Sequence, residues 1–272
     1  MISFAHIINP VQVNETSDLY IAQPITFETM RMARQFSEGI EDVTLYAIQH
    51  QDEARILLPD CFRRVPDLTR SVTDIKVFNK KKKLPFIKDI LDALAEAAPQ
   101  ADYLIYTNVD IALQPYFYRS ISKIIAQGYD AFVINRRTIS NRYGNIKHIP
   151  LMYAEIGEPH PGYDCFVIKR DRYAPFKLGT ICIGTAWIGR ALLANMAAYA
   201  GKFKEFRNEH LTFHVGDSQQ WRQDEYQDYF QENLKEYLRI FSQLESEQGA
   251  FEPIWRSYLL DTNDKRQFPS FE

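Results

Sequence analysis

The chain has 272 residues, 46% of them hydrophobic and 14% aromatic, which is enough for a substantial core in one large α/β domain or two small ones. A formal net charge of −3 provides no global basic field, so the composition argues against a nucleic-acid partner. Three widely spaced cysteines give neither a disulfide framework nor a zinc pattern, no apolar run reaches the roughly 18 residues of a membrane span, and no signal peptide is evident, so we expect a cytoplasmic protein without a transmembrane segment.

The first half of the chain alternates between predicted strands and helices. In chain order we expect a strand at 4–8, a polar loop at 11–23, a helix from the N-cap Thr26 to about Glu38, strands at 43–49 and 74–78, a helix at 86–98 that opens after Pro85, and a strand at 101–112. A strand, a helix and a second strand begin a βαβ unit, which predicts a parallel sheet.

The second half continues this alternation and ends in a long amphipathic helix. We expect a helix at 116–127, a strand at 130–135, a long loop at 136–157, strands at 165–169 and 210–215, a helix at 186–200 and the final helix at 224–247. The simplest organisation is a domain over residues 1–222, with a helical extension over residues 223–272 packed on it. A dimer face along the last helix is the less expected alternative.

The most informative stretch is the apolar run 103–106, which leads into Thr107-Asn108-Val109-Asp110. A strand that ends in this way places its polar residues at the carboxyl end of the sheet, where open α/β folds bind ligands. Asn108 and Asp110 are two residues apart and point the same way in an extended chain. Two oxygen ligands on one side suit a hard divalent cation that carries phosphates. The alternative is an ordinary strand end in which both residues only form a turn.

Three further segments carry residues suited to chemistry on phosphates and hydroxyls. Lys83 ends a run of four lysines just before the helix that opens near Pro85, and a helix N-terminus attracts phosphate. Asp164 comes directly before the strand at 165–169, where a carboxylate can deprotonate a hydroxyl. Each has a plain structural alternative, which is a solvated loop for Lys83 and a capped turn for Asp164.

His214 is a candidate for a single metal ligand or a phosphate contact, because it ends a predicted strand beside Gly216 and Asp217. His210 lies four residues earlier, about 13 Å away along a strand, so the two histidines are not expected to share a zinc ion. Of the arginines in the 136–157 loop, Arg136 is assigned to phosphate or acceptor binding. For at least two of Arg136, Arg137 and Arg142 we prefer ordinary surface charge.

Taken in order, these pieces resemble a GT-A type glycosyltransferase over roughly residues 4–221. In that family, a strand near the middle of the nucleotide-binding half ends in an Asp-x-Asp motif that holds Mn²⁺ or Mg²⁺ on a nucleotide diphosphate. Here the motif is Asn108-Val109-Asp110, so an amide replaces the first carboxylate and Asp110 is the stronger metal candidate. A late histidine often completes the metal site, and His214 in TFHVGD occupies a comparable place.

The stretches HPGYDCFVIKRD and IGTAWIGRALLANM are similar to the acceptor-side region of that family, where an Asp or Glu often acts as base. The resemblance therefore implies a single GT-A-like α/β domain that moves a sugar from a UDP- or GDP-sugar to a glycan or other hydroxyl-bearing acceptor. The implied residues are Asp164 as catalytic base, Asn108, Asp110, Lys83 and Arg136 at the nucleotide sugar, and Asp110 and His214 at Mn²⁺ or Mg²⁺.

Two alternatives remain at this point. A sugar nucleotidyltransferase has a similar fold, but its glycine-rich N-terminal loop is missing, because residues 7–11 contain no glycine. A non-catalytic protein that binds nucleotides or carbohydrates is kept open by Asn108, which departs from the motif. The sequence leaves the donor sugar, the stereochemical outcome and the oligomeric state open.

Overall fold

The structure is a computed structural model that describes residues 1–217 and 226–261, and within them nine strands form one sheet. The strands follow the order β3-β2-β1-β4-β7-β6-β9-β5, and β8 pairs with β6 beside this path. They are β1 (Ser3–Ile8), β2 (Asp42–Ala47), β3 (Phe62–Arg64), β4 (Tyr103–Thr107), β5 (Ala112–Leu113), β6 (Ala131–Ile139), β7 (Glu158–Lys169), β8 (Phe203–Phe206) and β9 (Thr212–Val215). Most strand pairs are parallel and three are antiparallel, so the predicted mostly parallel α/β fold is confirmed.

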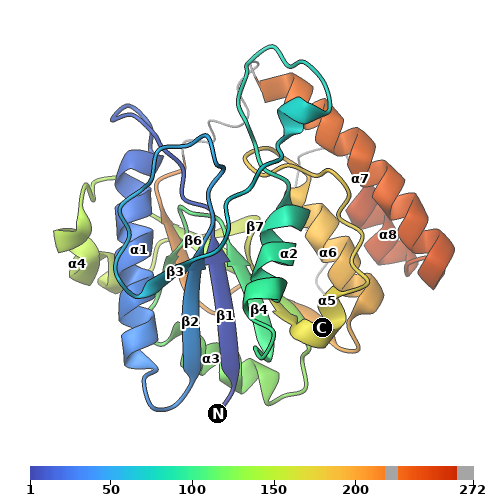
Figure 1. The fold of residues 1–272 in the computed structure, drawn as a ribbon. Coiled ribbons are helices and arrows are strands. Elements are labelled where there is room, and N and C mark those ends of the chain that lie inside the picture. Colours follow the sequence, from blue (N-terminus) through green and yellow to red (C-terminus); the bar gives the residue numbers. More distant parts are fainter. Residues whose placement is uncertain (218–225, 262–272) are drawn as a thin grey trace.

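Helices cover both faces of this sheet (Figure 1). They are α1 (Leu19–Phe36), α2 (Ile87–Ala97), α3 (Phe117–Ile125), α4 (Ile149–Ala154), α5 (Arg170–Tyr173), α6 (Ile188–Tyr199), α7 (Gln227–Gln248) and α8 (Pro253–Leu260), with short 3-10 turns at Val72–Asp74 and Ile146–His148. The strand β4 contributes to the core on both faces of the sheet. Ile105 packs in the core with α1 and α3, whereas Leu104 packs in the core with α2 and α6. Neighbouring residues of a strand face opposite sides, so a central strand must be apolar throughout.

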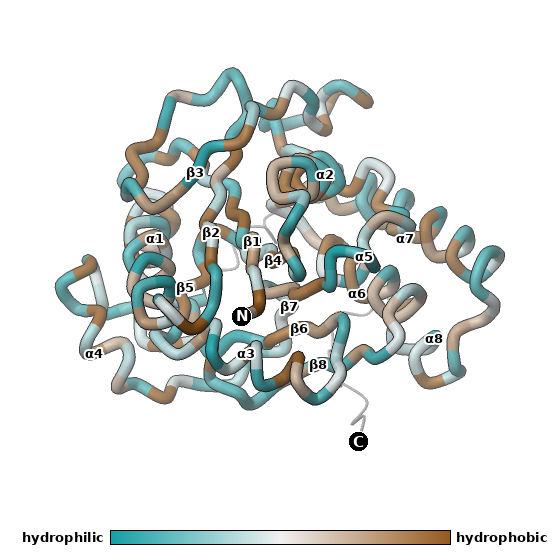
Figure 2. Tube along the Cα trace, turned by 60° about the horizontal axis from the view of Figure 1, so that its bottom comes forward, coloured by the Kyte–Doolittle hydropathy of each residue, from teal (hydrophilic) through white to brown (hydrophobic). Residues whose placement is uncertain are grey.

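The hydrophobic stretches lie among the central strands β1, β4 and β7, whereas α5 and much of the outer chain are hydrophilic (Figure 2). Among residues 1–217 and 226–261, no helix is long and apolar enough to cross a membrane.

The C-terminal helices share the core of the rest of the molecule. Tyr237 of α7 and Leu259 of α8 belong to the same buried cluster as Leu193 of α6. Buried Asn233 of α7 binds the backbone of Cys182 in both directions, accepting from its N–H at 3.0 Å and donating to its C=O at 2.8 Å. The helices α7 and α8 therefore share one core with α6, and the predicted boundary at 222/223 lies outside the described residues.

The N-terminal helix begins earlier than the sequence pattern indicates. α1 begins at Leu19, whose N–H is accepted by the side chain of the N-cap residue Asp18 at 2.9 Å, and Thr26 lies in its buried interior. Gln23 also belongs to this helix, where it exchanges two 2.9 Å hydrogen bonds with the backbone of Val11. The predicted loop to residue 23 and the Thr26 cap are therefore wrong, because Asp18 is the effective capping residue.

Two short segments differ from the prediction after β2. The three-residue strand β3 was not expected, because it is too short to show a pattern. The expected strand at 74–78 is absent: residues Val72–Asp74 form a 3-10 turn, in which the backbone N–H of Ser71 donates to Asp74 at 2.8 Å. A local side-chain bond of this kind favours a turn over a strand.

The predicted loop at 136–157 is partly strand and partly helix. β6 continues through Ile139 because two strands pair with the same side of it in turn. Residues 131–134 pair with β8, and residues 137–139 pair with β9. The same region contains α4, and β7 begins at Glu158 instead of residue 165. Only the pairing of distant strands makes this polar segment extended, so its local composition could not reveal it.

His6 in β1 predicts acid sensitivity of the fold. The ring is fully buried between the hydroxyls of Tyr118 and Thr107, at 2.8 and 3.0 Å, and burial lowers its pKa to about 3. Below pH about 6.5 the unfolded chain takes up a proton on His6 and the folded chain does not. The contribution of His6 to the free energy of unfolding is therefore fully present above that pH and is lost progressively as the pH falls towards 3. At pH 5 the loss is roughly 2 kcal/mol.

Urea unfolding at pH 7 and pH 5 measures this effect. We expect the difference between the two free energies to shrink by roughly that amount in His6→Asn and to stay unchanged in the control His148→Asn. An unchanged difference in His6→Asn would show that His6 is not the acid-sensitive group.

Candidate active site

The candidate site lies at the carboxyl end of β4, which pairs in parallel with β1 and antiparallel with β7. β4 ends at Thr107, and the chain turns at once, with the N–H of Ile111 donating to the C=O of Asn108 at 3.1 Å. β5 begins two residues after Asp110 and pairs with β9, which places Phe213 opposite Ala112. This pairing brings the C-terminal strand β9 beside the turn.

Asp110 and His214 therefore meet, although 104 residues separate them. The Nε2 atom of His214 lies 3.2 Å from Oδ2 of Asp110, and the side chains are 7% and 25% exposed, respectively. Nδ1 of His214 lies 2.6 Å from the carbonyl of Gly216, whose φ of 71° belongs to the left-handed region that favours glycine. Because that carbonyl accepts a hydrogen bond from the Nδ1–H group, Nε2 is the nitrogen directed at Asp110.

Asp110 and His214 shift each other's pKa. Burial raises the pKa of Asp110, but the neighbouring His214 and then Arg136 lower it more, so the net shift is downward. Burial lowers the pKa of His214, but Asp110 raises it more, so the net shift is upward. The site therefore favours a positive charge at Nε2 of His214, opposite an ionised Asp110.

Asn108 and Asp164 form a second pair beside the first. Nδ2 of Asn108 donates to Oδ1 of Asp164 at 2.8 Å, and the backbone N–H of Asn108 donates to the C=O of Asp164 at 3.2 Å. The hydroxyl of Tyr106 donates to Oδ1 of Asn108 at 3.1 Å. The amide is thus held at both ends, with its orientation set by its neighbours.

Arg136 lies at the centre of the charged groups, with its side chain 11% exposed. Its guanidinium donates to Oδ2 of Asp164 at 2.6 Å and to Oδ1 of Asp217 at 3.3 Å. Burial lowers the pKa of Arg136, but the carboxylates of Asp164, Asp110 and Asp217 raise it more. A permanent cation is therefore buried among three carboxylates.

Irregular pairing between β6 and β7 places Arg136 and Asp164 together. Ile134 pairs with Cys165 and Asn135 pairs with Tyr163, so Asp164 has no paired residue on β6. A second shift in register lies between Asn135 and Arg137, at the position of Arg136. Such bulges redirect side chains and are frequent beside active sites. The sequence carries no pattern that shows them.

His160 and Asp217 complete the cluster. Neither residue was predicted from the sequence to have a role. Nε2 of His160 lies 3.7 Å from Oδ2 of Asp217, and Nδ1 of His160 accepts the N–H of Gly162 at 2.8 Å. The only advance signal was their position beside Asp164 and His214 in the chain.

The remaining basic candidates lie elsewhere. Lys83 pairs with Asp52 of the loop after β2, and both side chains are 49% exposed. Arg137 donates to the backbone of residues 156 and 157, and Arg142 pairs with Glu155 at 3.2 Å. Arg136 is thus the arginine of that segment that joins the cluster, and phosphate binding by Lys83 stays a prediction.

Two observations bear on a metal ion. Oδ1 of Asp110 is buried and has no hydrogen-bond partner among the described residues, and His214 presents Nε2 beside the same carboxylate. The Nδ1 bond to a carbonyl orients the ring as in many metal-ligating histidines. Within residues 1–217 and 226–261, no group of three or more His, Cys, Asp or Glu side chains is placed to hold a metal. The pair fits a cation whose other ligands come from outside the protein.

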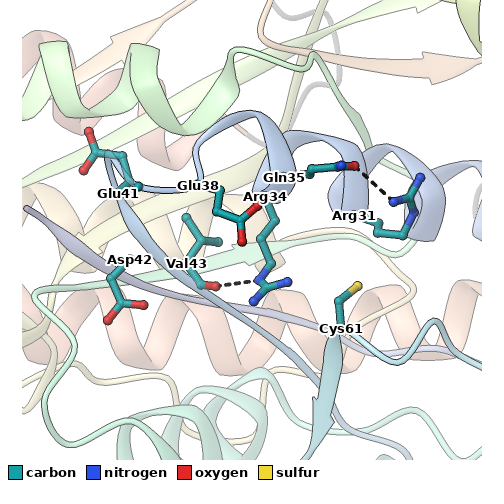
Figure 3. A pocket seen from close by; sticks show the side chains of 9 residues that line it. Arg31, Arg34, Gln35, Glu38, Glu41, Asp42, Val43 and Cys61 are labelled. Carbon is teal, nitrogen blue, oxygen red and sulfur yellow. Dashed lines mark hydrogen bonds between the residues drawn. The ribbon is translucent and has the colours of Figure 1, made fainter.

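A surface cavity of about 420 Å³ lies far from this chemistry. Arg31, Arg34, Glu38 and Cys61 line it together with Asp42, the first residue of β2 (Figure 3). It therefore lies towards the amino ends of the parallel strands, at the opposite edge of the sheet from Asp110. Open α/β folds bind their ligands at the carboxyl ends, so the cavity does not compete with the candidate site.

No family model and no curated protein sequence matches this chain. Among solved structures, it is similar to TarS 1–349 of S. aureus in complex with UDP-GlcNAc, with 8% identity, 95% of this chain and 72% of that chain covered, and a TM-score of 0.49. A glucose-1-phosphate thymidylyltransferase from Bacillus anthracis has 9% identity, coverage of 92% and 97%, and a TM-score of 0.43. The galactosyltransferase LgtC in complex with donor and acceptor sugar analogs has 9% identity, coverage of 93% and 99%, and a TM-score of 0.42.

All three TM-scores are below 0.5 and all three identities are below 10%, so these likenesses carry no conclusion about the activity of this chain.

Proposed function

We propose that this protein transfers a sugar from a nucleoside diphosphate sugar to an acceptor hydroxyl. The observation that carries the proposal is the convergence of Asp110, His214 and Arg136 at the carboxyl end of β4, where Oδ1 of Asp110 lacks a partner among the described residues. A buried oxygen without a hydrogen bond destabilises the fold, so its presence at this edge of the sheet favours a ligand-binding role.

The chain's own charges suit departure of a nucleoside diphosphate. Negative charge builds up on the phosphates as the bond to the sugar breaks, and groups fixed in advance beside that charge lower the barrier. Arg136 contributes a permanent positive charge in a site with little solvent, and Nε2 of His214 is favoured in its charged form. Both lie beside Asp110, so the diphosphate is expected there and the sugar towards Asn108 and Asp164.

Asp110 and His214 would alternatively hold Mn²⁺ or Mg²⁺ once the ion displaces the proton from Nε2, with the diphosphate supplying further oxygen ligands. When bound, such an ion adds positive charge to the leaving diphosphate. The metal is part of the proposal, and Asp164 as the acceptor base stays a prediction from the sequence.

Release of nucleoside diphosphate from a panel of UDP- and GDP-sugars tests the proposal. We expect slow hydrolysis of at least one donor without acceptor, which Asp110→Ala abolishes. The surface variant Asp171→Ala is the matched control, because Asp171 is 59% exposed and follows the end of β7 that pairs with the start of β4, away from Asp110. Tight nucleotide binding without turnover would favour a binding protein, and release of pyrophosphate from a nucleoside triphosphate and a sugar phosphate would favour a nucleotidyltransferase.

A further inference from the structure

The two oxygens of Asp164 are already engaged within the protein. Oδ1 accepts from Asn108 at 2.8 Å, Oδ2 accepts from Arg136 at 2.6 Å, and the side chain is 10% exposed. A base must take a proton from the acceptor, yet a proton on Asp164 would remove the charge that balances a buried guanidinium. Loss of one partner of a buried ion pair is strongly unfavourable. Both oxygens of Asp164 are therefore committed to structural partners, Asn108 and Arg136.

Asn108 and Asp164 are matched to each other. The amide of Asn108 offers an N–H donor, which an aspartate at the same position would lack. Two carboxylates with oxygens about 2.8 Å apart would repel each other, so Asp at 108 is incompatible with an ionised Asp at 164. The amide of this pair is thus at position 108 and its carboxylate is at position 164, on the neighbouring strand β7.

The local backbone of β7 is shaped around the Asp164 carboxylate. The pairing irregularity with β6 leaves Asp164 without a paired residue on that strand. At Gly162, an added Cβ would lie 2.9 Å from Oδ2 of Asp164 and 2.7 Å from the His160 ring. Glycine is thus the residue that allows Asp164 to lie over the preceding chain.

We propose that Asp164 is a positioning residue that holds Asn108 and Arg136 at the donor site. This role rests on the proposed function and deepens it, because it moves Asp164 from the acceptor chemistry to the donor side. Asp164 acts through two residues: it fixes the amide that follows β4, and it fixes the cation beside Asp110.

Exchange of the two residues tests this role. We would compare Asp164→Asn, Asn108→Asp and the double variant that carries both, with Asp171→Asn as an exposed control. The readouts are affinity for UDP and GDP with Mn²⁺, donor hydrolysis without acceptor, transfer to acceptor, and the unfolding temperature. We expect each single variant to lose about tenfold or more in donor affinity and hydrolysis. The double variant is expected to recover part of both, because it restores one amide and one carboxylate to the pair but leaves Arg136 opposite an amide at position 164.

A base gives a different pattern. If Asp164 is a catalytic base, Asp164→Asn would keep its donor affinity and donor hydrolysis but lose transfer to the acceptor. The double variant would then also stay inactive in transfer. That result would overturn the positioning role and leave the proposed function standing. A double variant that recovers neither donor affinity nor unfolding temperature also overturns it. If the wild-type protein neither binds nor cleaves any nucleotide sugar, the proposed function fails and this role fails with it.

Discussion

Asp110→Ala is expected to weaken the binding of UDP or GDP in the presence of Mn²⁺ by about 100-fold, because it removes the carboxylate that is proposed to bind the metal beside the diphosphate. The reason is geometric: Asp110 presents a buried oxygen without a partner among the described residues, next to Nε2 of His214. The other two carboxylates of the cluster, Asp164 and Asp217, both already accept from Arg136.

The same variant is expected to fold normally. A buried oxygen without a hydrogen bond destabilises the native state, so removal of Asp110 relieves one unfavourable contribution while it loses the contact with His214. The free energy of unfolding should therefore stay within about 1 kcal/mol of the wild-type value. Functional sites commonly lose activity and keep stability when changed in this way.

Titration calorimetry with and without Mn²⁺, together with urea unfolding, measures both effects. The conservative variant Asp110→Asn separates charge from shape, because it keeps the size of the side chain and removes the anion. Unchanged affinity in Asp110→Ala would show that the assignment of the metal and diphosphate to this edge is wrong. A large loss of stability would show instead that Asp110 is a structural residue.

Arg136→Met is expected to destabilise the fold by about 3–5 kcal/mol, which is the usual effect of removing one partner of a buried ion pair. Arg136 donates to Asp164 at 2.6 Å and to Asp217 at 3.3 Å, and methionine would fill part of the space without neutralising either carboxylate. Because β6 and β7 are joined at this point, we expect the loss of stability to reach the central sheet and not only a loop.

Arg142→Met is the matched control. Arg142 pairs with Glu155 at 3.2 Å, but its side chain is 70% exposed, so its removal should change the free energy of unfolding by less than about 1 kcal/mol. Chemical unfolding of the three proteins at pH 7 measures the difference. Similar values for the two variants would mean that the cluster around Arg136 is open to solvent, in which case its proposed electrostatic role would be lost.

Local sequence was sufficient to locate one half of the candidate site. An apolar run that ends in Asn108 and Asp110 identified β4 and its carboxyl end, because a buried strand must be apolar and its last residue must be followed by polar groups. The helices α2 and α3 and the strands β1 and β2 were predicted for the same reason: their hydrophobic periods repeat over several residues. The capping of α1 by Asp18 was missed, since several residues nearby could serve as a cap.

Tertiary structure alone decided how the parts of the site fit together. His214 reaches Asp110 because β9 pairs with both β5 and β6, and Arg136 reaches Asp164 because β6 and β7 pair irregularly at both positions. Pairing between strands far apart in the chain leaves no periodic signal in either of them, which is why Arg136 was expected in a loop. The sequence by itself thus determined which edge of the sheet carries the chemistry, whereas the non-local pairing decided which charges meet there and left Asp164 bound to Asn108 and Arg136.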